Sequence, residues 1–363
     1  MKRENSGHSQ YFKYGKKLIG KVKKKLYIPY LFVFRNKEFK RVWYWEQHKI
    51  KNGNQLPNHK FYVIRKNPNA TGLLSCYLSA LGHLKSIEGT DYIPVMDIQT
   101  FYNGLIHNKD DEAVENAVER KNGWNYYFKN FSDYAFADIQ EAKNIVLGKG
   151  RNPLDGTVFF DNTAINIAFL KDWYDLDRKY FVLNPDLQAR FEKTTSTLLD
   201  GKRVLGVMIR DGYMVLAEAR ERNAAEYQKH PGIGGHPKQP TIDELIENIE
   251  MYLEKWQCEY VFVVAETSYV VDILRQRFGD RFITTDRERR NVKSLVLEEY
   301  NSASSVYYER NAMVDINTDY LEEIFVLSKC NALYAGKCSG SIVASLWNRG
   351  EYEHIVIKSD GLY

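Results

Sequence analysis

Five short apolar runs recur between residues 202 and 358, and longer polar or amphipathic segments separate them. The runs are VLGVMI, YVFVVA, FITT, ALYAG and HIVI, which begin at Val204, Tyr260, Phe282, Ala332 and His354. Each run has the length and the β-branched or aromatic content of a buried strand. The alternation of such strands with helical segments predicts a parallel sheet of the doubly wound α/β class.

The segments between these runs carry helix signals. Residues 241–256 open with a capping box, in which Thr241 is followed by Glu244, and their apolar residues recur on one face. Residues 268–278 and 319–328 show the same helical spacing. We therefore expect helices over these three ranges.

The first half of the chain carries a separate α/β signal. Residues 61–64 and 92–96 read as strands, and residues 71–84 between them have apolar positions at helical spacing. A strand, a helix and a strand in so short a stretch form a βαβ unit, which requires parallel strands and a right-handed crossover.

Residues 100–200 are rich in Asn, Asp, Tyr and Trp. Helices are expected near 136–147, 162–172 and 186–199, and an irregular, aromatic-lined surface is expected around Trp124. No internal repeat or low-complexity linker interrupts the chain, so the strand pattern that restarts near residue 200 is the basis for a domain boundary there.

Positive charge is concentrated at the start of the sequence. The formal net charge is +4, yet residues 1–41 contain 13 lysines and arginines and only two glutamates. Lysines between residues 16 and 25 alternate with apolar residues, as in amphipathic segments that lie on anionic lipid. A basic tail without a partner explains the pattern equally well. Nucleic acid is disfavoured as a partner because beyond the tail only the short stretch 287–290 is basic.

The distribution of apolar residues and cysteines bears on location. No stretch approaches the roughly 18 consecutive apolar residues of a membrane span, and the polar start lacks a secretory signal. We expect a cytoplasmic protein that the basic segment could attach peripherally to the inner face of the membrane. Buried free thiols are expected because no CxxC pair occurs among the four cysteines: Cys76, Cys258, Cys330 and Cys338.

An arginine follows the first strand of the second half. In open α/β sheets the ligand lies just past the carboxyl ends of the strands, and Arg210 stands at such an end. Its rigid fork of donors suits a phosphate and would stabilise the charge on a departing diphosphate. The alternative is a salt bridge to Asp211 or Asp286 that ties loops together.

Polar residues also follow two later strands. Glu266 and Thr267 could reach a ribose or nucleoside, although Thr267 or Ser268 could equally be a helix N-cap. A turn of small residues precedes a helix expected at 342–347, and its backbone N–H groups could bind an anion. The turn contains Ser339, Gly340 and Ser341.

The glycine-punctuated segment between Gly212 and Pro240 resembles a mobile loop that closes over substrate. Any of its acidic or imidazole side chains could activate an acceptor hydroxyl. These are Glu218, Glu221, Glu226, His230 and His236. The candidate catalytic residues are Arg210, Asp211 and Glu218.

One triplet has the form of a metal motif. Asp175-Leu176-Asp177 matches the DxD pattern that can hold Mg²⁺ or Mn²⁺ beside a sugar diphosphate. It lies far from the second-half strands, and its charged neighbours suit a solvated face. We therefore expect no metal site and no cofactor.

Over roughly residues 200–350 the chain resembles the fucosyltransferases of GT-B architecture, which include the core α-1,6-fucosyltransferases, the nodulation fucosyltransferase and bacterial polysaccharide relatives. In that family a His-x-Arg-Arg strand end, a His-Pro, an Ala-Thr-Asp-Asp strand end and a Ser-rich loop follow one another. The matching stretches here are Met-Ile-Arg-Asp at 208–211, His-Pro at 236–237, Ala-Glu-Thr-Ser at 265–268 and Cys-Ser-Gly-Ser at 338–341. Glu323 matches the family's acidic residue one turn before a Leu-Ser.

The resemblance implies two Rossmann-like domains that face a cleft, and metal-independent, inverting transfer of a sugar such as fucose from GDP-fucose. The acceptor would be a bacterial surface glycan or a lipid-linked precursor. Arg210 would bind the diphosphate, and His236, Glu323 and the loop at Ser339 would lie near the nucleotide. The expected domains are a basic extension at 1–58, an acceptor-side domain at 59–200 and a donor domain at 201–363.

Two departures from the family pattern leave an alternative open. Met208 and Asp211 stand where the family has a histidine and a second arginine, so no catalytic base carries over. A catalytically inactive scaffold of a polysaccharide-assembly complex would keep the fold without the activity. An epimerase-like enzyme is disfavoured because no GxGxxG follows an early strand.

Overall fold

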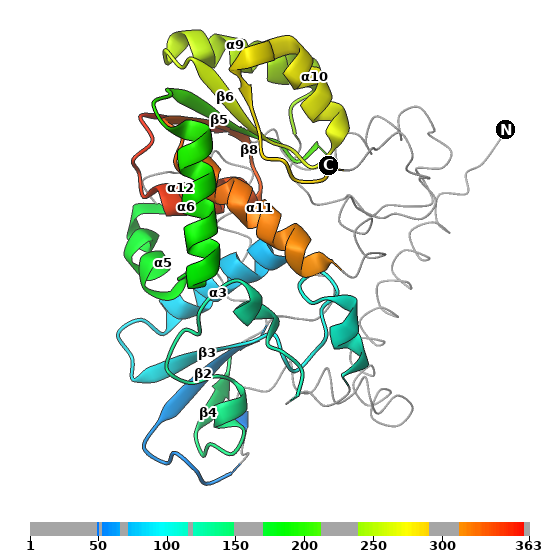
Figure 1. The fold of residues 1–363 in the computed structure, drawn as a ribbon. Helices are drawn as coiled ribbons and strands as arrows, with labels where there is room; N and C mark the ends of the chain where they lie inside the picture. The colour runs from blue at the N-terminus through cyan, green and yellow to red at the C-terminus, as the bar shows by residue number, and fades with distance from the viewer. Residues whose placement is uncertain are drawn as a thin grey trace, which may run out of the picture.

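The computed structural model describes residues 49–50, 53–65, 72–114, 119–148, 170–211, 239–289 and 312–358. These residues form two separate sheets with a layer of helices between them (Figure 1). The α/β class expected from the sequence is confirmed. Expectations for residues 1–48, 162–169 and 212–238 lie outside the described residues, and these ranges include most of the extension expected at 1–58 and nearly all of the glycine-punctuated loop.

All five predicted strands of the second half are present in one sheet. They are β5 (Val204–Met208), β6 (Tyr260–Val264), β7 (Phe282–Ile283), β8 (Ala332–Gly336) and β9 (His354–Lys358). The strand order is β7-β6-β5-β8-β9, and every neighbouring pair is parallel.

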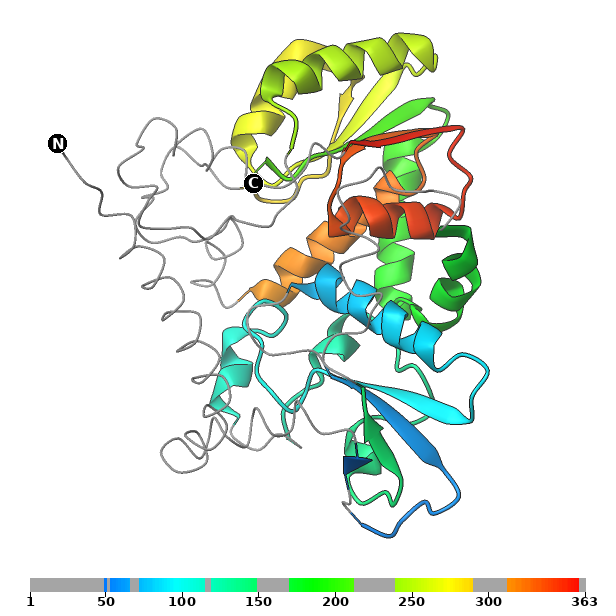
Figure 2. The same ribbon diagram turned by 180° about the vertical axis from the view of Figure 1, so that it is seen from behind.

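Helices cover both faces of this sheet. Leu205 and Val207 point toward α9 (Ile242–Lys255) and α10 (Ser268–Phe278), whereas Val204 and Met208 point into a core shared with α11 (Met313–Leu327) and α12 (Ser339–Asn348). Figure 2 shows the two helix pairs on opposite sides of the strands. Alternate strand residues are therefore buried on each face, and the doubly wound prediction is confirmed.

The helices begin where local capping or tertiary contacts allow. Thr241 caps α9 and exchanges two hydrogen bonds with Glu244, as the capping box predicts. By contrast, α11 begins at Met313, six residues before the start expected at residue 319. Its first turn is stabilised from outside the helix, because the Asn108 side chain accepts a hydrogen bond from Val314 N at 3.0 Å.

The first sheet has the order β1-β4-β2-β3. The predicted βαβ unit is confirmed as β2 (Lys60–Arg65), α3 (Leu73–Ser86) and β3 (Tyr92–Asp97), with β2 and β3 parallel. β4 (Ile145–Leu147) lies parallel to β2 on its other side, and β1 (Lys49–Ile50) pairs antiparallel with β4.

The prediction of a helix at 136–147 is wrong. This stretch forms a short 3₁₀ turn at Ala137–Ile139 and then the strand β4. Ile145 and Leu147 are buried against the first sheet, and β4 hydrogen-bonds to β2, which lies about eighty residues earlier in the chain. Pairing with a distant strand overrides the local helical spacing here.

The aromatic stretch around Trp124 is core rather than surface, so that prediction is also wrong. Trp124 and Phe128 are fully buried and stacked, with their ring centroids 4.5 Å apart. Phe181 packs against both and lies 3.9 Å from the Tyr77 ring of α3. These rings fill the layer between α3 and the irregular chain, which explains the high aromatic content without an exposed binding surface.

Three further helices or turns lie between the sheets or beside them. The helix expected at 186–199 is confirmed as α6 (Pro185–Leu199), which packs against α11. The short 3₁₀ turn Lys171–Trp173 and α5 (Tyr174–Tyr180) follow the undescribed range that ends at residue 169.

The four cysteines are buried free thiols, as predicted. Within the described ranges, no helix has both the length and the apolar character that a membrane span requires.

The triplet Asp175-Leu176-Asp177 lies in α5, and only part of its predicted setting is correct. Asp175 is exposed and pairs with Arg178, but Asp177 is buried and accepts a hydrogen bond from the Tyr77 hydroxyl. Tyr77 Oη in turn accepts a hydrogen bond from Trp347 Nε1 at 2.9 Å. Asp177 therefore joins α5, α3 and α12 instead of facing solvent.

We expect Asp177→Asn to flatten the pH dependence of stability. Burial raises the pKa of Asp177 to about 7, so the folded state holds this proton more tightly than the unfolded chain. Wild-type stability should then fall as the pH rises from about 4 to 7, by up to about 1.4 kcal/mol for each pH unit. Asparagine keeps the acceptor without the titration, so urea unfolding at pH 5 and pH 8 should differ less in the variant. Asp175→Asn, at an exposed position, should retain the wild-type slope.

Candidate functional site

The strand order of the second sheet fixes where a ligand would bind. The chain leaves β5 toward β6 and β7 on one side, and later adds β8 and β9 on the other side. In doubly wound sheets the ligand occupies the crevice at such a reversal, past the carboxyl ends of the two central strands. The candidate donor site therefore lies where Ile209-Arg210-Asp211 leaves β5 and where residues 337–341 leave β8.

Arg210 projects from the end of β5 and keeps part of its side chain exposed. Its Nε lies 3.1 Å from Glu266 Oε1, and 24% of the side-chain surface is accessible. The sequence suggested Asp211 or Asp286 as a salt-bridge partner of Arg210. Among the described ion pairs the partner is Glu266 instead. The Glu266 carboxylate holds the guanidinium, and part of the Arg210 side chain remains accessible to an incoming anion.

Asp211 is fully buried and binds the turn that connects β6 to α10. Its carboxylate accepts hydrogen bonds from the backbone N–H groups of Glu266 and Thr267 and from the Thr267 hydroxyl. Thr267 is the N-cap of α10, since its side chain accepts from Val270 N. Burial raises the pKa of Asp211 to about 7. The aspartate thus fixes the position of Glu266, the partner of Arg210.

Glu323 is buried between two arginines. Its Oε2 lies 3.0 Å from Arg287 Nε, and its Oε1 pairs with Arg289 and accepts a hydrogen bond from Thr285 Oγ1 at 2.8 Å. The Glu323 side chain is 0% exposed. Each carboxylate oxygen of Glu323 lies beside one of the two arginines. We therefore assign to Glu323 the role of holding these arginines in place.

Sequence reasoning missed Arg287 and Arg289 as parts of this edge. Both donate to the carbonyl of Ala265 at the end of β6, and the Arg287 guanidinium lies 5.6 Å from the centre of the Tyr320 ring. The usable signal was their spacing, because residues two apart in an extended chain point to the same side. In the sequence alone they stand out only as part of the short basic stretch at 287–290.

The small-residue turn after β8 is the first turn of α12, which begins at Ser339 instead of residue 342. Ser341 Oγ accepts a hydrogen bond from Cys338 N at 3.1 Å and donates to Cys338 O at 2.9 Å, so this buried side chain caps the helix. Ser339 is half-buried. Lys337, which precedes the turn, is almost fully buried and was not predicted as a site residue.

Gly340 allows α12 to approach the end of β5 closely. A Cβ atom at this position would lie 2.5 Å from the Tyr320 hydroxyl and 2.9 Å from Met208 Sδ. Real Cβ contacts are longer than this, so a larger residue must displace Met208, Tyr320 or the helix itself.

Gly340→Ala should lower the free energy of unfolding by about 1–3 kcal/mol, because the added methyl overpacks this junction. Gly72→Ala is the matched control, since a Cβ there meets nothing within 4 Å and its φ of −65° suits alanine. The control should change stability by about 1 kcal/mol or less. Chemical denaturation of both variants measures the difference, and equal effects would show that the junction has room for a side chain.

Two of the predicted site residues, Glu218 and His236, lie outside the described residues. The structure brings the other predicted residues to the carboxyl edge of the second sheet. They are Arg210, Asp211, Glu266, Thr267, Glu323, Ser339, Gly340 and Ser341. In the described part of the chain, no group of three His, Cys, Asp or Glu side chains is arranged to hold a metal ion.

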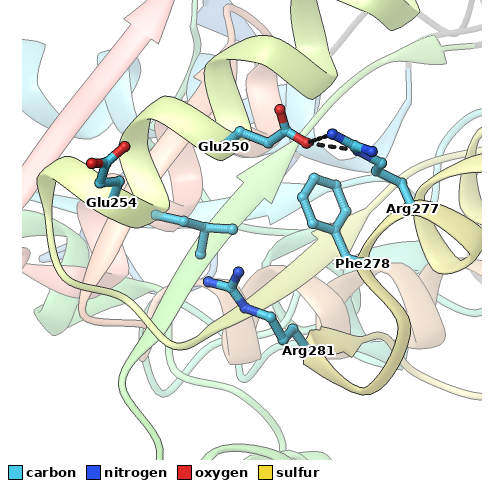
Figure 3. Close-up of a pocket in the computed structure, with 6 residues that line it drawn as sticks. Glu250, Glu254, Arg277, Phe278 and Arg281 are labelled. Atoms are coloured by element: carbon cyan, nitrogen blue, oxygen red, sulfur yellow. Dashed lines mark hydrogen bonds and ion pairs between the residues drawn. The ribbon is translucent and has the colours of Figure 1, made fainter.

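A separate cavity lies elsewhere in this half of the molecule. A cavity of about 460 Å³ opens between the C-terminal ends of α9 and α10 (Figure 3). Glu250 Oε1 and Arg277 Nε close one side of it at 2.6 Å. Both helices end there before the chain enters the next strand, so the cavity lies at the amino-terminal edge of the sheet. It is therefore opposite to the edge where doubly wound sheets bind their ligands.

Comparison with known proteins gave structural likenesses only. No protein-family model matches the chain, and no curated protein matches its sequence. The solved structures similar to it include the fucosyltransferase NodZ from Bradyrhizobium, with 11% identity, coverage of 84% of this chain and 98% of that chain, and a TM-score of 0.42. POFUT1 in complex with GDP is 10% identical over 85% of this chain and 98% of that chain, with a TM-score of 0.42. A mutant of Arabidopsis thaliana FUT1 in complex with GDP is 11% identical over 90% and 77%, also with a TM-score of 0.42.

Proposed function

We propose that this protein is a glycosyltransferase that binds a nucleoside-diphosphate sugar at the carboxyl ends of β5 and β8. The observation that carries the proposal is the position of Arg210. Its partly exposed guanidinium stands at the end of the central strand, next to the reversal of strand order. A diphosphate placed there would meet the guanidinium and the first turn of α12 together.

The proposed reaction is a displacement at the anomeric carbon of the donor. An acceptor hydroxyl attacks this carbon, the bond to the diphosphate oxygen breaks, and a base takes the hydroxyl proton. Arg210 stabilises the negative charge that develops on the departing nucleoside diphosphate. Attack from the face opposite the leaving group inverts the anomeric configuration. Glu218 is retained as a candidate base.

Asp211 has a supporting place in this proposal. Its oxygens already accept three hydrogen bonds from Glu266 and Thr267, so we assign it to holding the Glu266–Arg210 pair in position. A base must reach the proton it abstracts, and a fully buried, hydrogen-bonded carboxylate is poorly placed for that.

We further propose GDP-fucose as the donor, on the basis of the fucosyltransferase-like residues at 208–211, 265–268 and 338–341 and of Glu323.

The acceptor is proposed to be a bacterial surface glycan or lipid-linked precursor held by the domain at 59–200. Residues 1–41 would bring the enzyme to an anionic membrane surface. Transfer is proposed to need no metal because a guanidinium can take the role of the cation at the diphosphate.

A second candidate function is an inactive scaffold of a polysaccharide-assembly complex. The observation in its favour is Asp211, which stands where the related enzymes have a second arginine and is occupied by structural hydrogen bonds. Such a protein would keep the two-sheet fold while its donor site binds no nucleotide.

A donor panel tests the two candidates. The chain is incubated with GDP-fucose, GDP-mannose, UDP-galactose, UDP-glucose and CMP-sialic acid in EDTA, and release of the free nucleotide is measured with and without an acceptor extract. We expect release from GDP-fucose above the rate without protein, together with a melting temperature raised by GDP. A ligand present at 100 times its Kd stabilises the folded protein by about 2.7 kcal/mol. If no compound in the panel releases its nucleotide or stabilises the protein, the scaffold function is favoured.

A further inference from the structure

Gln239 lies across the crevice between the ends of the two central strands. Its side-chain oxygen accepts a hydrogen bond from Arg210 N at 3.1 Å, and its side-chain nitrogen donates to Lys337 O at 3.2 Å. Only 8% of the residue is exposed. A carboxamide carries an acceptor oxygen and a donor nitrogen side by side, so it can accept from one strand end and donate to the other.

The position of Gln239 follows from where the strand pairing stops. β5 and β8 pair in parallel up to Met208 and Ala335, two residues before Arg210 and Lys337. Beyond that point the two chains no longer hydrogen-bond to each other as a ladder. The carboxamide of Gln239 takes the place of a peptide group between them and satisfies one backbone donor and one acceptor.

Gly336 provides the space for this side chain. A Cβ atom at position 336 would lie 2.9 Å from Gln239 Cδ and closer still to its oxygen. Any side chain at this position would expel the carboxamide from between the strands. The site for Gln239 is therefore built from both strand ends.

We propose that Gln239 is a positioning residue for the donor diphosphate. It sets the separation between the Arg210 segment and the turn that opens α12, so that the guanidinium and the helix N–H groups address the same anion. The inference rests on the proposed donor site. It assigns to Gln239 no contact with the donor.

The test uses a variant whose hydrogen-bonding capacity depends on pH. In Gln239→Glu the ionised carboxylate can accept from Arg210 N but cannot donate to Lys337 O, whereas the protonated acid can do both. We expect the affinity of Gln239→Glu for GDP to be at least tenfold below wild type at pH 8 and to recover toward wild type as the pH falls to 5. A residue that served stability alone would not produce such a recovery in affinity.

Two further variants complete the experiment. Gln239→Met has a similar volume without the polar groups and should bind GDP weakly at every pH. Gln188→Met, at a half-buried helix position where the side chain donates a hydrogen bond to Glu192 in the same helix, should bind GDP like wild type. Titration calorimetry with GDP in EDTA measures all four proteins, and circular dichroism establishes that each is folded.

The outcomes separate the two proposals. Wild-type affinity in folded Gln239→Glu at pH 8, or in folded Gln239→Met, would overturn the role of Gln239 while leaving the donor site intact. If Gln239→Glu fails to fold at pH 8, its affinity for GDP at pH 5 and the affinity of Gln239→Met still test the role of Gln239. An absence of GDP binding by the wild type would overturn the donor site itself, and the role of Gln239 with it.

Discussion

Replacing Glu323 with glutamine is expected to lower the free energy of unfolding by about 3–5 kcal/mol, the cost of breaking a buried ion pair from one side. Glutamine keeps the shape of the side chain but removes the charge that faces Arg287 and Arg289. These arginines are 8% and 6% exposed, so solvent cannot replace the lost carboxylate. Urea unfolding followed by circular dichroism measures the loss.

Glu250→Gln is the matched control for this prediction. It makes the same chemical change in a helix, but Glu250 and its partner Arg277 are 41% and 55% exposed. Exposed pairs contribute about 0–1 kcal/mol, so the control should remain close to wild type. A loss in Glu323→Gln no larger than in Glu250→Gln would contradict the view that Glu323 anchors the carboxyl edge of the sheet.

Arg210→Ala is expected to lower kcat/KM for the donor by about 10²–10³-fold. This is the effect of removing one preorganised group that stabilises developing negative charge. Because the Arg210 side chain is partly exposed, the variant should fold with little loss of stability. Steady-state kinetics of nucleotide release from GDP-fucose give the ratio.

Two other substitutions sharpen this result. Arg210→Lys keeps the charge without the planar fork, so it should retain more activity than alanine and less than wild type. Arg275→Ala removes an arginine that is 56% exposed and lies away from the crevice in α10, and it should have no effect on kcat/KM. Equal activity of Arg210→Ala and Arg275→Ala would exclude Arg210 from the chemistry.

The sequence pattern was sufficient for the architecture of the second half. Strands there are buried on both faces, so they appear as continuous apolar runs, and the capping box of Thr241 marks the start of α9. The reversal of strand order then places Arg210 and Ser339 at one edge. Because parallel strands end at the same edge of a sheet, the sequence pattern is enough to predict that these two residues share an edge.

The errors concern features that depend on contacts between distant residues. β4 becomes a strand because it pairs with β2, and the rings around Trp124 are buried because α3 and Phe181 cover them. Similarly, α11 begins early because Asn108 caps it from more than two hundred residues away. The spacing of apolar residues along a short stretch of sequence does not identify such distant partners.

The inner residues of the site were missed for the same reason. Gln239 joins Arg210 and Lys337, which are 29 and 98 residues away from it in the chain. Arg287 and Arg289 meet Glu323 across more than thirty residues. A single glutamine or a short basic stretch has no pattern of its own, so these roles emerge only when the strand ends are brought together.

The most direct test of the proposed donor site is hydrogen–deuterium exchange of the full chain with and without saturating GDP in EDTA. The account predicts slower amide exchange in peptides that cover residues 209–211 and 337–342, at the ends of β5 and β8, and unchanged exchange around the cavity at Glu250 and Arg281. Protection at the α9–α10 cavity without protection at the two strand ends would contradict it.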